Sequence, residues 1–336
     1  MAKHKIATIG SHSALQILKG AKDEGFETIC ICIKGKEKPY KMFPVADNII
    51  TIDSYDDFFK IEDQLVKENA VIIPHASFIA YMGHEKVEQM KLPYFGNKKI
   101  LHWESDRKME RQWLTKAGLL MPKIFESPDD IDRPVIVKFH GAHGGAGYFL
   151  AKHKKDFNKK IKLHPNENDY VIQEYIMGVP MYVHYFYSSI TGELEILSFD
   201  KRYESNVDSL GRVSARDQIA LPRIDPSYVI VGNLPIVVRE SLLPRFIEMG
   251  ENTIKESKEI ASPGLFGPFC LECIITPDQE IYVFEISARI VAGTNPYTHG
   301  SPYSYLKYDE PMSTGRRIAR EIKIAEKQNK TKEIFH

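Results

Sequence analysis

Short apolar runs alternate with amphipathic segments through the first 95 residues, and this alternation limits the fold more than any other feature of the sequence. The apolar runs predict strands at residues 5–10, 27–33, 48–53 and 70–74. The spacing of apolar residues between these runs predicts helices at residues 14–24 and 55–67. Strands that alternate with helices over short connections form a parallel sheet with helices on both faces. We therefore expect an α/β fold with a parallel sheet in its N-terminal part.

Two polar segments follow strands of this predicted sheet. Residues 10–13 (Gly-Ser-His-Ser) follow the first strand, and residues 74–78 (Pro-His-Ala-Ser-Phe) follow the fourth. Ligands of parallel sheets gather beyond the carboxyl ends of the strands. The first segment lacks the G-x-G-x-x-G spacing of a dinucleotide site, and Ser11 and Ser13 suit the N-cap of the next helix, where an anion also binds. Capping does not explain His12, which is therefore a candidate ligand contact.

The charge balance excludes several classes of protein. Lys and Arg together number 45, and Asp and Glu together also number 45. This balance gives no electrostatic reason to expect nucleic acid or an anionic membrane as a partner. No apolar run approaches the ~20 residues of a membrane-spanning helix, and the first residues show no signal-peptide pattern. We expect a cytoplasmic protein.

The four cysteines lie at positions 30, 32, 270 and 273. The C-x-x-C spacing of the second pair is typical of metal sites, but both pairs lie in runs rich in β-branched residues. Residues three apart in a strand point to opposite faces, so Cys270 and Cys273 cannot bind one ion without a turn between them. We expect buried, reduced thiols.

The pattern changes near residues 93–96. A helix is predicted at residues 106–117, with Trp113 and Leu114 on its apolar side, and from residue 134 onward the chain reads mainly as strands. Two further helices are predicted, from near Pro244 to residue 260 and over residues 315–328.

A glycine-rich loop gives the strongest local signal. A strand that contains Lys138 leads into residues 140–147, which include four glycines, and a second strand pattern follows. Backbone N–H groups in such a loop approach an anion with no Cβ in the way. The loop is not a Walker A motif, because it lacks G-K-[ST] and its lysine precedes the glycines. We interpret it as a hairpin over a polyphosphate, with a plain mobile hairpin as the alternative.

A second predicted hairpin brings two carboxylates together. If Thr276 pairs with Ile281 across a four-residue loop, Glu272 lies directly opposite Glu285. Like charges opposed on one face destabilise a sheet, and a divalent cation between them removes the repulsion. The alternative is an acid–base pair with a raised pKa. We favour the metal because a phosphate-binding loop occurs elsewhere in the chain.

In their order along the chain, these motifs resemble those of the ATP-grasp ligases, and the resemblance covers nearly the whole sequence. More narrowly, the chain resembles the archaeal formate-dependent synthetases of purine biosynthesis, which make 5-formamidoimidazole-4-carboxamide ribonucleotide (FAICAR) from AICAR, formate and ATP on the way to IMP. The segments behind the narrower resemblance are GSHSAL (10–15), IPHASF (73–78), FHGAHGGAGYF (139–149), DKRYESN (200–206), GNLPIVVRESLLP (232–244), GPFCLE (267–272) and FEISARI (284–290).

The resemblance implies a fold, a reaction and a set of site residues. The fold is an ATP-grasp domain of two subdomains, residues 99–336, preceded by an N-terminal parallel α/β domain, residues 1–98, that contributes to the nucleotide-substrate site. The implied enzyme is a C–N ligase that uses ATP with Mg²⁺ or Mn²⁺, takes formate and AICAR as substrates and forms a homo-oligomer.

The site residues that the resemblance implies fall into four groups. The ATP-binding residues are Lys138, His140, Gly141, Gly144, Gly145, Gly147, Gln173, Glu174, Tyr175, Ile176 and Glu204. The residues that contact the nucleotide substrate are His12, Ser13, Ser77 and Asn233, although Ser77 and Asn233 also suit ordinary turns. The metal ligands are Glu272 and Glu285, and the catalytic cations are Arg289 and Lys138.

The sequence departs from the family's pattern at two positions. Ser287 stands where many ATP-grasp enzymes have Asn two residues after the second metal-binding Glu, and Ala76 stands where a glycine is expected. The second change leaves open a ligase that acts on another acid or another amino nucleotide. A nucleotide-binding paralogue without catalysis is the remaining alternative.

Overall fold

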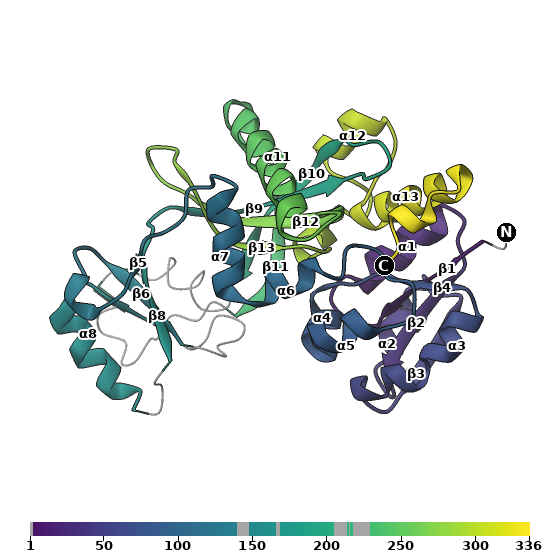
Figure 1. Cartoon of the computed structure of the whole chain (residues 1–336), viewed down its shortest axis with the longest axis horizontal. Helices are drawn as coiled ribbons and strands as arrows, with labels where there is room; N and C mark the ends of the chain where they lie inside the picture. The colour runs from purple at the N-terminus through teal and green to yellow at the C-terminus, as the bar shows by residue number, and fades with distance from the viewer. Residues whose placement is uncertain (1–2, 140–147, 166–168, 205–213, 215, 218–228) are drawn as a thin grey trace.

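The computed structural model describes residues 3–139, 148–165, 169–204, 214, 216–217 and 229–336. In this part of the chain, three sheets lie side by side, as Figure 1 shows. The N-terminal sheet and a small sheet lie at opposite ends, and a five-stranded sheet lies between them.

The N-terminal sheet has the parallel arrangement that the sequence predicts. Its strands are β1 (Lys5–Ile9), β2 (Thr28–Ile33), β3 (Asn48–Ile52) and β4 (Ala70–Ile72). They pair in parallel in the order β3-β2-β1-β4. The helix predicted between the first two strands is α1 (Ala14–Asp23), and the short helix α2 (Lys38–Met42), which we did not predict, follows β2.

The single helix predicted at residues 55–67 is wrong in detail. A 3₁₀ helix, η1 (Tyr55–Lys60), comes first, and α3 (Glu62–Lys67) begins after Ile61. Asp57 accepts the backbone N–H of Ser54, and this local contact starts the tight turn. Phe58 and Leu65, one from each piece, are both buried in the core beside the sheet.

Four helices connect the N-terminal sheet to the rest of the chain. They are α4 (Ala76–Met82), α5 (His84–Gln89), α6 (Ile100–Ser105) and α7 (Arg107–Lys116). Only α7 was predicted, and Trp113 and Leu114 on it are fully buried as expected. The first three are too short for a 3.6-residue period to stand out in the sequence.

The small sheet is an antiparallel module with its own core. Its strands are β5 (Ile124–Phe125), β6 (Val135–Phe139), β7 (Tyr148–Ala151) and β8 (Tyr170–Glu174), in the order β5-β8-β6-β7. The helices η2 (Pro128–Asp130), α8 (Lys154–Lys160) and η3 (Ile161–Leu163) accompany it. Phe139, Phe149 and Phe157 lie in a core that contains only residues of this module.

The central sheet is antiparallel. Its strands are β9 (Val179–Tyr187), β10 (Leu194–Glu204), β11 (Ile230–Ile236), β12 (Gly267–Ile275) and β13 (Ile281–Ser287), in the order β11-β10-β9-β12-β13. Between β11 and β12 lie η4 (Glu240–Leu242) and α11 (Leu243–Ile260), and the predicted start of α11 near Pro244 is confirmed. One face of the sheet packs in a core with residues of α7 and α11, which cross it in Figure 1. The other face carries the polar side chains described below.

The last helices return the chain to its beginning. They are η5 (Ala292–Tyr297), α12 (Pro302–Tyr308), α13 (Thr314–Gln328) and η6 (Thr331–Glu333). Figure 1 shows α13 beside α1, and one apolar core joins Ile17 of α1 to Phe186 of the central sheet and Ile318 of α13. A Cβ at Gly20 or Gly315 would collide with the backbone of the other helix, so this close crossing requires glycine in both helices.

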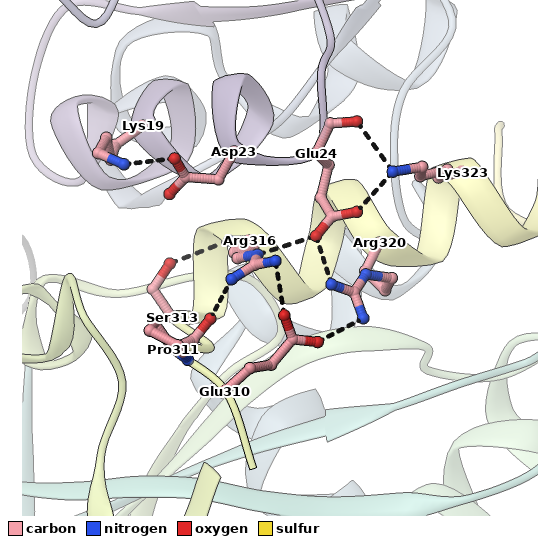
Figure 2. A network of polar contacts seen from close by, with 9 residues as sticks. All are labelled: Lys19, Asp23, Glu24, Glu310, Pro311, Ser313, Arg316, Arg320 and Lys323. Carbon is pink, nitrogen blue, oxygen red and sulfur yellow. Dashed lines mark hydrogen bonds and ion pairs between the residues drawn. The ribbon is translucent and has the colours of Figure 1, made fainter. Parts of the chain in front are cut away.

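A charged cluster ties α13 to the end of α1. Glu24 accepts hydrogen bonds from Arg316, Arg320 and Lys323, and Glu310 bridges the two arginines, as Figure 2 shows. The Glu24 side chain is 2% exposed, and the cations cover it. No helix in the described part of the chain is both long and apolar enough to cross a membrane.

Candidate active site

A cavity of about 200 Å³ lies between the polar face of the central sheet and the carboxyl edge of the N-terminal sheet. It brings together predicted residues that lie far apart in the sequence. His12, Asn233, Glu272, Glu285 and Arg289 all line it. These residues come from the α/β domain, from β11 and from the β12–β13 hairpin, which supports one shared site.

The two carboxylates predicted to oppose each other do so. Glu272 on β12 pairs with Glu285 on β13, but the loop register was predicted wrongly, because Ile281 pairs with Ile275. A bulge between Glu272 and Cys273 shifts the register by one and restores the glutamate pair. Cys270 and Cys273 are free, buried and assigned to different cores, as their spacing on a strand implies.

Glu272 has an oxygen that lacks a partner. Its Oε1 accepts a hydrogen bond from Arg202, whereas its Oε2 is buried with no hydrogen-bond partner. Burial raises the pKa of Glu272 to about 7; the Arg202 charge opposes this shift and the Glu285 charge adds to it. A buried, unpaired carboxylate oxygen beside a second carboxylate is the donor set that Mg²⁺ binds. The site therefore fits the metal, although the described residues hold no group of three or more metal-binding side chains.

Two further glutamates, which we did not predict, hold the strand that carries Glu285. Glu110 on α7 accepts the N–H of Ile286 at 2.7 Å, and Glu104 on α6 accepts the N–H of Ala288 at 3.1 Å. Ile286 lies on the outer edge of β13 and Ala288 follows directly after that strand, so these carboxylates take the place of a neighbouring strand. The sequence held a signal for one of them, because Glu110 precedes Trp113 and Leu114 on the apolar face of its helix.

Arg289 is held by one of these glutamates. Its Nη2 lies 2.7 Å from Glu104 Oε1, while its buried Nε has no hydrogen-bond partner. Burial raises the pKa of Glu104, and the Arg289 charge partly offsets this rise. The guanidinium thus keeps a free donor, as a group that stabilises a transferring phosphoryl needs.

The two polar segments at the edge of the N-terminal sheet meet as expected. The rings of His12 and His75 are stacked with centroids 5.4 Å apart, and Ser11 donates to Ser77 at 3.1 Å. Burial lowers the pKa of His12 to about 3 and that of His75 to about 4, so both rings are neutral near pH 7. His12 also has a φ of 49°, a left-handed conformation that non-glycine residues rarely adopt.

The expected N-cap of α1 is confirmed in its position but not in its hydrogen bond. Ser13 occupies the N-cap position, but its side chain makes no capping bond. Instead its Oγ lies 2.9 Å from His12 Nδ1. Ser13 contacts the His12 ring, and Ser77 contacts Ser11, the residue before His12. Neither Ser13 nor Ser77 is among the residues that line the cavity.

Lys138 lies on β6 of the small sheet and is half-buried. Burial lowers its pKa, and the charges of Glu285, Glu110 and Glu272 oppose that shift. Its Nζ donates to Gln173 Oε1 at 3.3 Å. Lys138 therefore lies close enough to these carboxylates for an electrostatic interaction with them. His140, Gly141, Gly144, Gly145 and Gly147 lie outside the described residues.

The predicted adenine-binding segment forms the end of β8 and the residues after it. Glu174 does not present a free carboxylate, because it accepts from Arg133 at 2.9 Å and from the N–H of Lys123 at 3.0 Å. Tyr175 donates its N–H to Pro134, and Ile176 is 9% exposed. Glu204 ends β10 and pairs with Ile230. Backbone groups of this segment remain the better candidates for contact with a base.

Three residues that line the cavity were not predicted from the sequence. Arg202 stacks on Tyr182, with its guanidinium carbon 4.1 Å from the ring centroid. His184 and Asp200 form a buried pair, with Nε2 2.7 Å from Oδ1. Only His184 carried a signal, because it is a polar residue within the apolar strand β9, whereas Asp200 and Arg202 lie in the charged end of β10.

The comparisons with known proteins agree with this geometry. A family described as a domain of unknown function (DUF1297) matches residues 149–336, and one described as a protein of unknown function (DUF1246) matches residues 6–125. The N5-carboxyaminoimidazole ribonucleotide synthetase solved with ADP is 17% identical, with a TM-score of 0.69 over 96% of this chain and 77% of its own. The fold and the site define the chain as an ATP-grasp protein with an N-terminal parallel α/β domain, as predicted.

Nearer relatives narrow the family. The 5-formaminoimidazole-4-carboxamide-1-(beta)-D-ribofuranosyl 5'-monophosphate synthetases of Pyrococcus abyssi and Saccharolobus solfataricus are 57% and 50% identical. These matches cover 98% and 97% of this chain, and 98% of each relative. The crystal structure of an IMP biosynthesis protein PurP from Thermococcus kodakaraensis is 31% identical, with a TM-score of 0.78 over 98% of this chain and all of that one. The chain belongs to this synthetase family.

Proposed function

We propose that this protein catalyses the ATP- and formate-dependent formylation of AICAR to FAICAR in IMP biosynthesis, releasing ADP and phosphate. The observation that carries the proposal is the single cavity in which the Glu272–Glu285 pair and Arg289 meet His12 and Asn233. Phosphoryl-transfer groups thereby face residues expected to hold the amino nucleotide. The whole-length similarity to synthetases of this name supports the same reaction.

Glu272 and Glu285 are the residues that would hold Mg²⁺ or Mn²⁺. The unpartnered Oε2 of Glu272 supports this role. A divalent cation there would neutralise charge on the ATP phosphates. Lys138 and Arg289 supply the remaining positive charge from the chain itself, and Glu104 keeps Arg289 in place.

The reaction needs activation, because a free carboxylate has no adequate leaving group. A formate oxygen attacks the γ-phosphorus of ATP, the bond to the β-phosphate oxygen breaks, and ADP and formyl phosphate result. The 5-amino nitrogen of AICAR then bonds to the formyl carbon as the carbon–oxygen bond to phosphate breaks. The amine loses one proton in this step, and in the net reaction the released hydrogen phosphate carries that proton. Water must be excluded meanwhile, since formyl phosphate hydrolyses readily.

Phosphate release tests the proposal directly. The protein is given ATP and Mg²⁺ with formate alone, with AICAR alone and with both, while FAICAR is followed in parallel. We expect release only with both substrates, with FAICAR appearing in step. Release that needs another acid or another amine would instead support a different ligase, and ATP binding without turnover would support a non-catalytic paralogue.

The first prediction concerns the carboxylate pair. Glu285→Gln removes one of the two charges that would hold the metal, so formate-dependent phosphate release should fall at least about 100-fold. The control is Glu280→Gln in the same hairpin, where Glu280 is 53% exposed and pairs with Arg245. Both variants should keep the circular dichroism spectrum of the parent. Wild-type turnover in Glu285→Gln with the same metal dependence would contradict the assignment.

One residue favours a second candidate within the same class. Ala76 lines the cavity where the family pattern has a glycine. Its methyl group reduces the room beside the histidines, so a different amino nucleotide is the alternative substrate. The comparison of AICAR with other amino nucleotides in the same assay separates the two. Homo-oligomer formation and a cytoplasmic location stay predictions of the family resemblance.

A further inference from the structure

A chain of three polar side chains crosses the wall of the cavity. His184 on β9, Asp200 on β10 and Asn233 on β11 all line it. His184 Nε2 lies 2.7 Å from Asp200 Oδ1, and Asn233 Nδ2 donates to Asp200 Oδ2 at 2.7 Å. The His184 and Asp200 side chains are only 2% and 1% exposed. Two of these three residues have no role in the reaction described above.

The register of the central sheet fixes this chain. In the β10–β11 ladder Asn233 lies opposite Arg202, so Asp200, two residues earlier, shares its face and is its diagonal neighbour. His184 lies on the adjacent strand and pairs with Ser198. Gly293 of η5 covers the pair from the other side. A Cβ at that position would lie 2.7 Å from both Asp200 Cγ and His184 Cε1, so there is no room for one.

The carboxylate determines how the Asn233 amide is oriented. An ionised carboxylate has only acceptors, so the group that Asn233 turns toward Asp200 is its NH₂. The amide oxygen therefore points away from Asp200. His184 occupies the other carboxylate oxygen, so Asp200 cannot rotate without losing one of its two hydrogen bonds.

We infer that His184 and Asp200 are positioning residues that hold the Asn233 amide oxygen toward the bound nucleotide, where it accepts an N–H of the 5-amino group. The inference rests on the proposed function and deepens it. Arg202, opposite Asn233, donates to Glu272 of the carboxylate pair. The Asn233 oxygen thus lies on the side of the cavity where the attacking amine must meet the phosphoryl-transfer groups.

The arrangement selects for an amine. A ligand with an acceptor in place of the amino group would set a lone pair against the Asn233 oxygen, and a ligand with only hydrogen there would leave that oxygen unpaired. Hydrogen bonds in a chain polarise one another. The Asp200 charge therefore strengthens the Asn233 oxygen as an acceptor through the amide.

Two ligands test the inference in binding, independently of turnover. They are AICAR and the same ribonucleotide with hydrogen in place of the 5-amino group, and their Kd values are measured by titration calorimetry on the full chain. We expect the wild-type protein to bind AICAR about tenfold more tightly, as one hydrogen bond to a half-buried acceptor allows. In Asp200→Ala and in Asn233→Ala the preference should fall to within about twofold. A purely structural role would weaken both ligands alike and keep the ratio.

A matched control separates the amide from the strand. Tyr297→Phe removes a hydroxyl that accepts the Ile236 N–H and donates to the Phe199 carbonyl, so it loosens β11 without touching the amide. This variant should keep the tenfold preference. If Asp200→Ala does not fold, Gly293→Ala makes the same test, because the added Cβ displaces the Asp200 carboxylate.

Each outcome has a distinct meaning. A wild-type protein that binds both nucleotides equally, or an Asp200→Ala or Asn233→Ala variant that keeps the tenfold preference, overturns the inference and leaves the proposed reaction intact. A wild-type protein that does not bind AICAR at all overturns the proposed function instead, and the inference with it.

Discussion

Glu110 lies on the apolar face of α7 and accepts the Ile286 N–H beside the carboxylate pair. Burial, with the nearby Glu285 charge in support, holds the pKa of Glu110 well above its ordinary value. Folding therefore shifts the titration of this carboxyl toward its protonated form. Glutamine is neutral and keeps an acceptor oxygen, so substitution by glutamine and by alanine should affect stability differently.

The second prediction compares these two substitutions of Glu110. Glu110→Gln keeps the acceptor oxygen and should change the free energy of unfolding by less than about 1 kcal/mol, whereas Glu110→Ala should cost about 2–3 kcal/mol, because it leaves the Ile286 N–H unpaired. Urea unfolding followed by circular dichroism measures both. Equal losses in the two variants would contradict the role.

The same residue predicts a pH dependence. Because the pKa of Glu110 is raised on folding, its contribution is complete below the ordinary carboxyl pKa and is lost as pH rises through the folded pKa. Glu110→Gln removes this group from titration. The variant should therefore lose less stability than the wild type as pH is raised from 5 to 8, in paired unfolding curves. Parallel pH profiles would count against the raised pKa.

At the scale of elements, helix α13 depends on one carboxylate. Burial raises the pKa of Glu24, but hydrogen bonds from Arg320, Arg316 and Lys323 outweigh it and lower the pKa to about 2. The group therefore stabilises the fold above the ordinary carboxyl pKa, and this contribution disappears as pH falls toward 2. In Figure 2 the neighbouring Asp23 bonds to Lys19, a residue of its own helix.

The third prediction compares these neighbours. Glu24→Gln removes the buried anion that three cations share, although Glu310 still pairs with the two arginines. This change should lower the free energy of unfolding at pH 7 by about 2 kcal/mol. Asp23→Asn removes an exposed i,i+4 pair and should cost less than about 0.5 kcal/mol. The difference between the two variants should shrink at pH 3, as chemical unfolding at both pH values would show. A difference that persists at pH 3 would point to packing in place of charge.

Helices and strands could be predicted where the segment was long enough to show its hydrophobic pattern and where its pairing partner lay near in the sequence. The helices α1, α7, α11 and α13 each carry enough residues to show their period, and the parallel strands stand out as continuous apolar runs. The glutamate pair followed from hairpin geometry even though its loop register was wrong, because the bulge corrects the count. Glu104, Arg202, His184 and Asp200 could not be assigned, since their partners come from other segments of the chain and no spacing in one sequence reveals such contacts.

At the scale of the whole molecule, the cores do not follow the predicted domain boundary. The boundary at residue 98 stays a prediction, yet one core joins Ile6 and Val71 to Leu197 and Phe266 across it. The small sheet, in contrast, buries its own apolar residues. Cooperative units follow shared cores, so the module of β5–β8 is the part most independent of the rest.

The fourth prediction follows from these cores. Differential scanning calorimetry should show two transitions, with the smaller one belonging to the β5–β8 module. Mg²⁺ and ATP at about 100 times Kd add about 2.7 kcal/mol to the bound state and should move the smaller transition toward the larger. Phe157→Ala, in the module core, should lower only the smaller transition. A single transition that shifts as a whole in this variant would refute the separation.

The crossing of α1 and α13 also sets an order on synthesis. Ile6 and Ile17 leave the ribosome well before Ile318 and Ile322, which complete their core some 300 positions later. Until those residues emerge, an apolar face of the nascent N-terminal domain stays open to water. The α/β domain is thus translated before the helix that completes its core, and molecular chaperones can bind its open face during that interval.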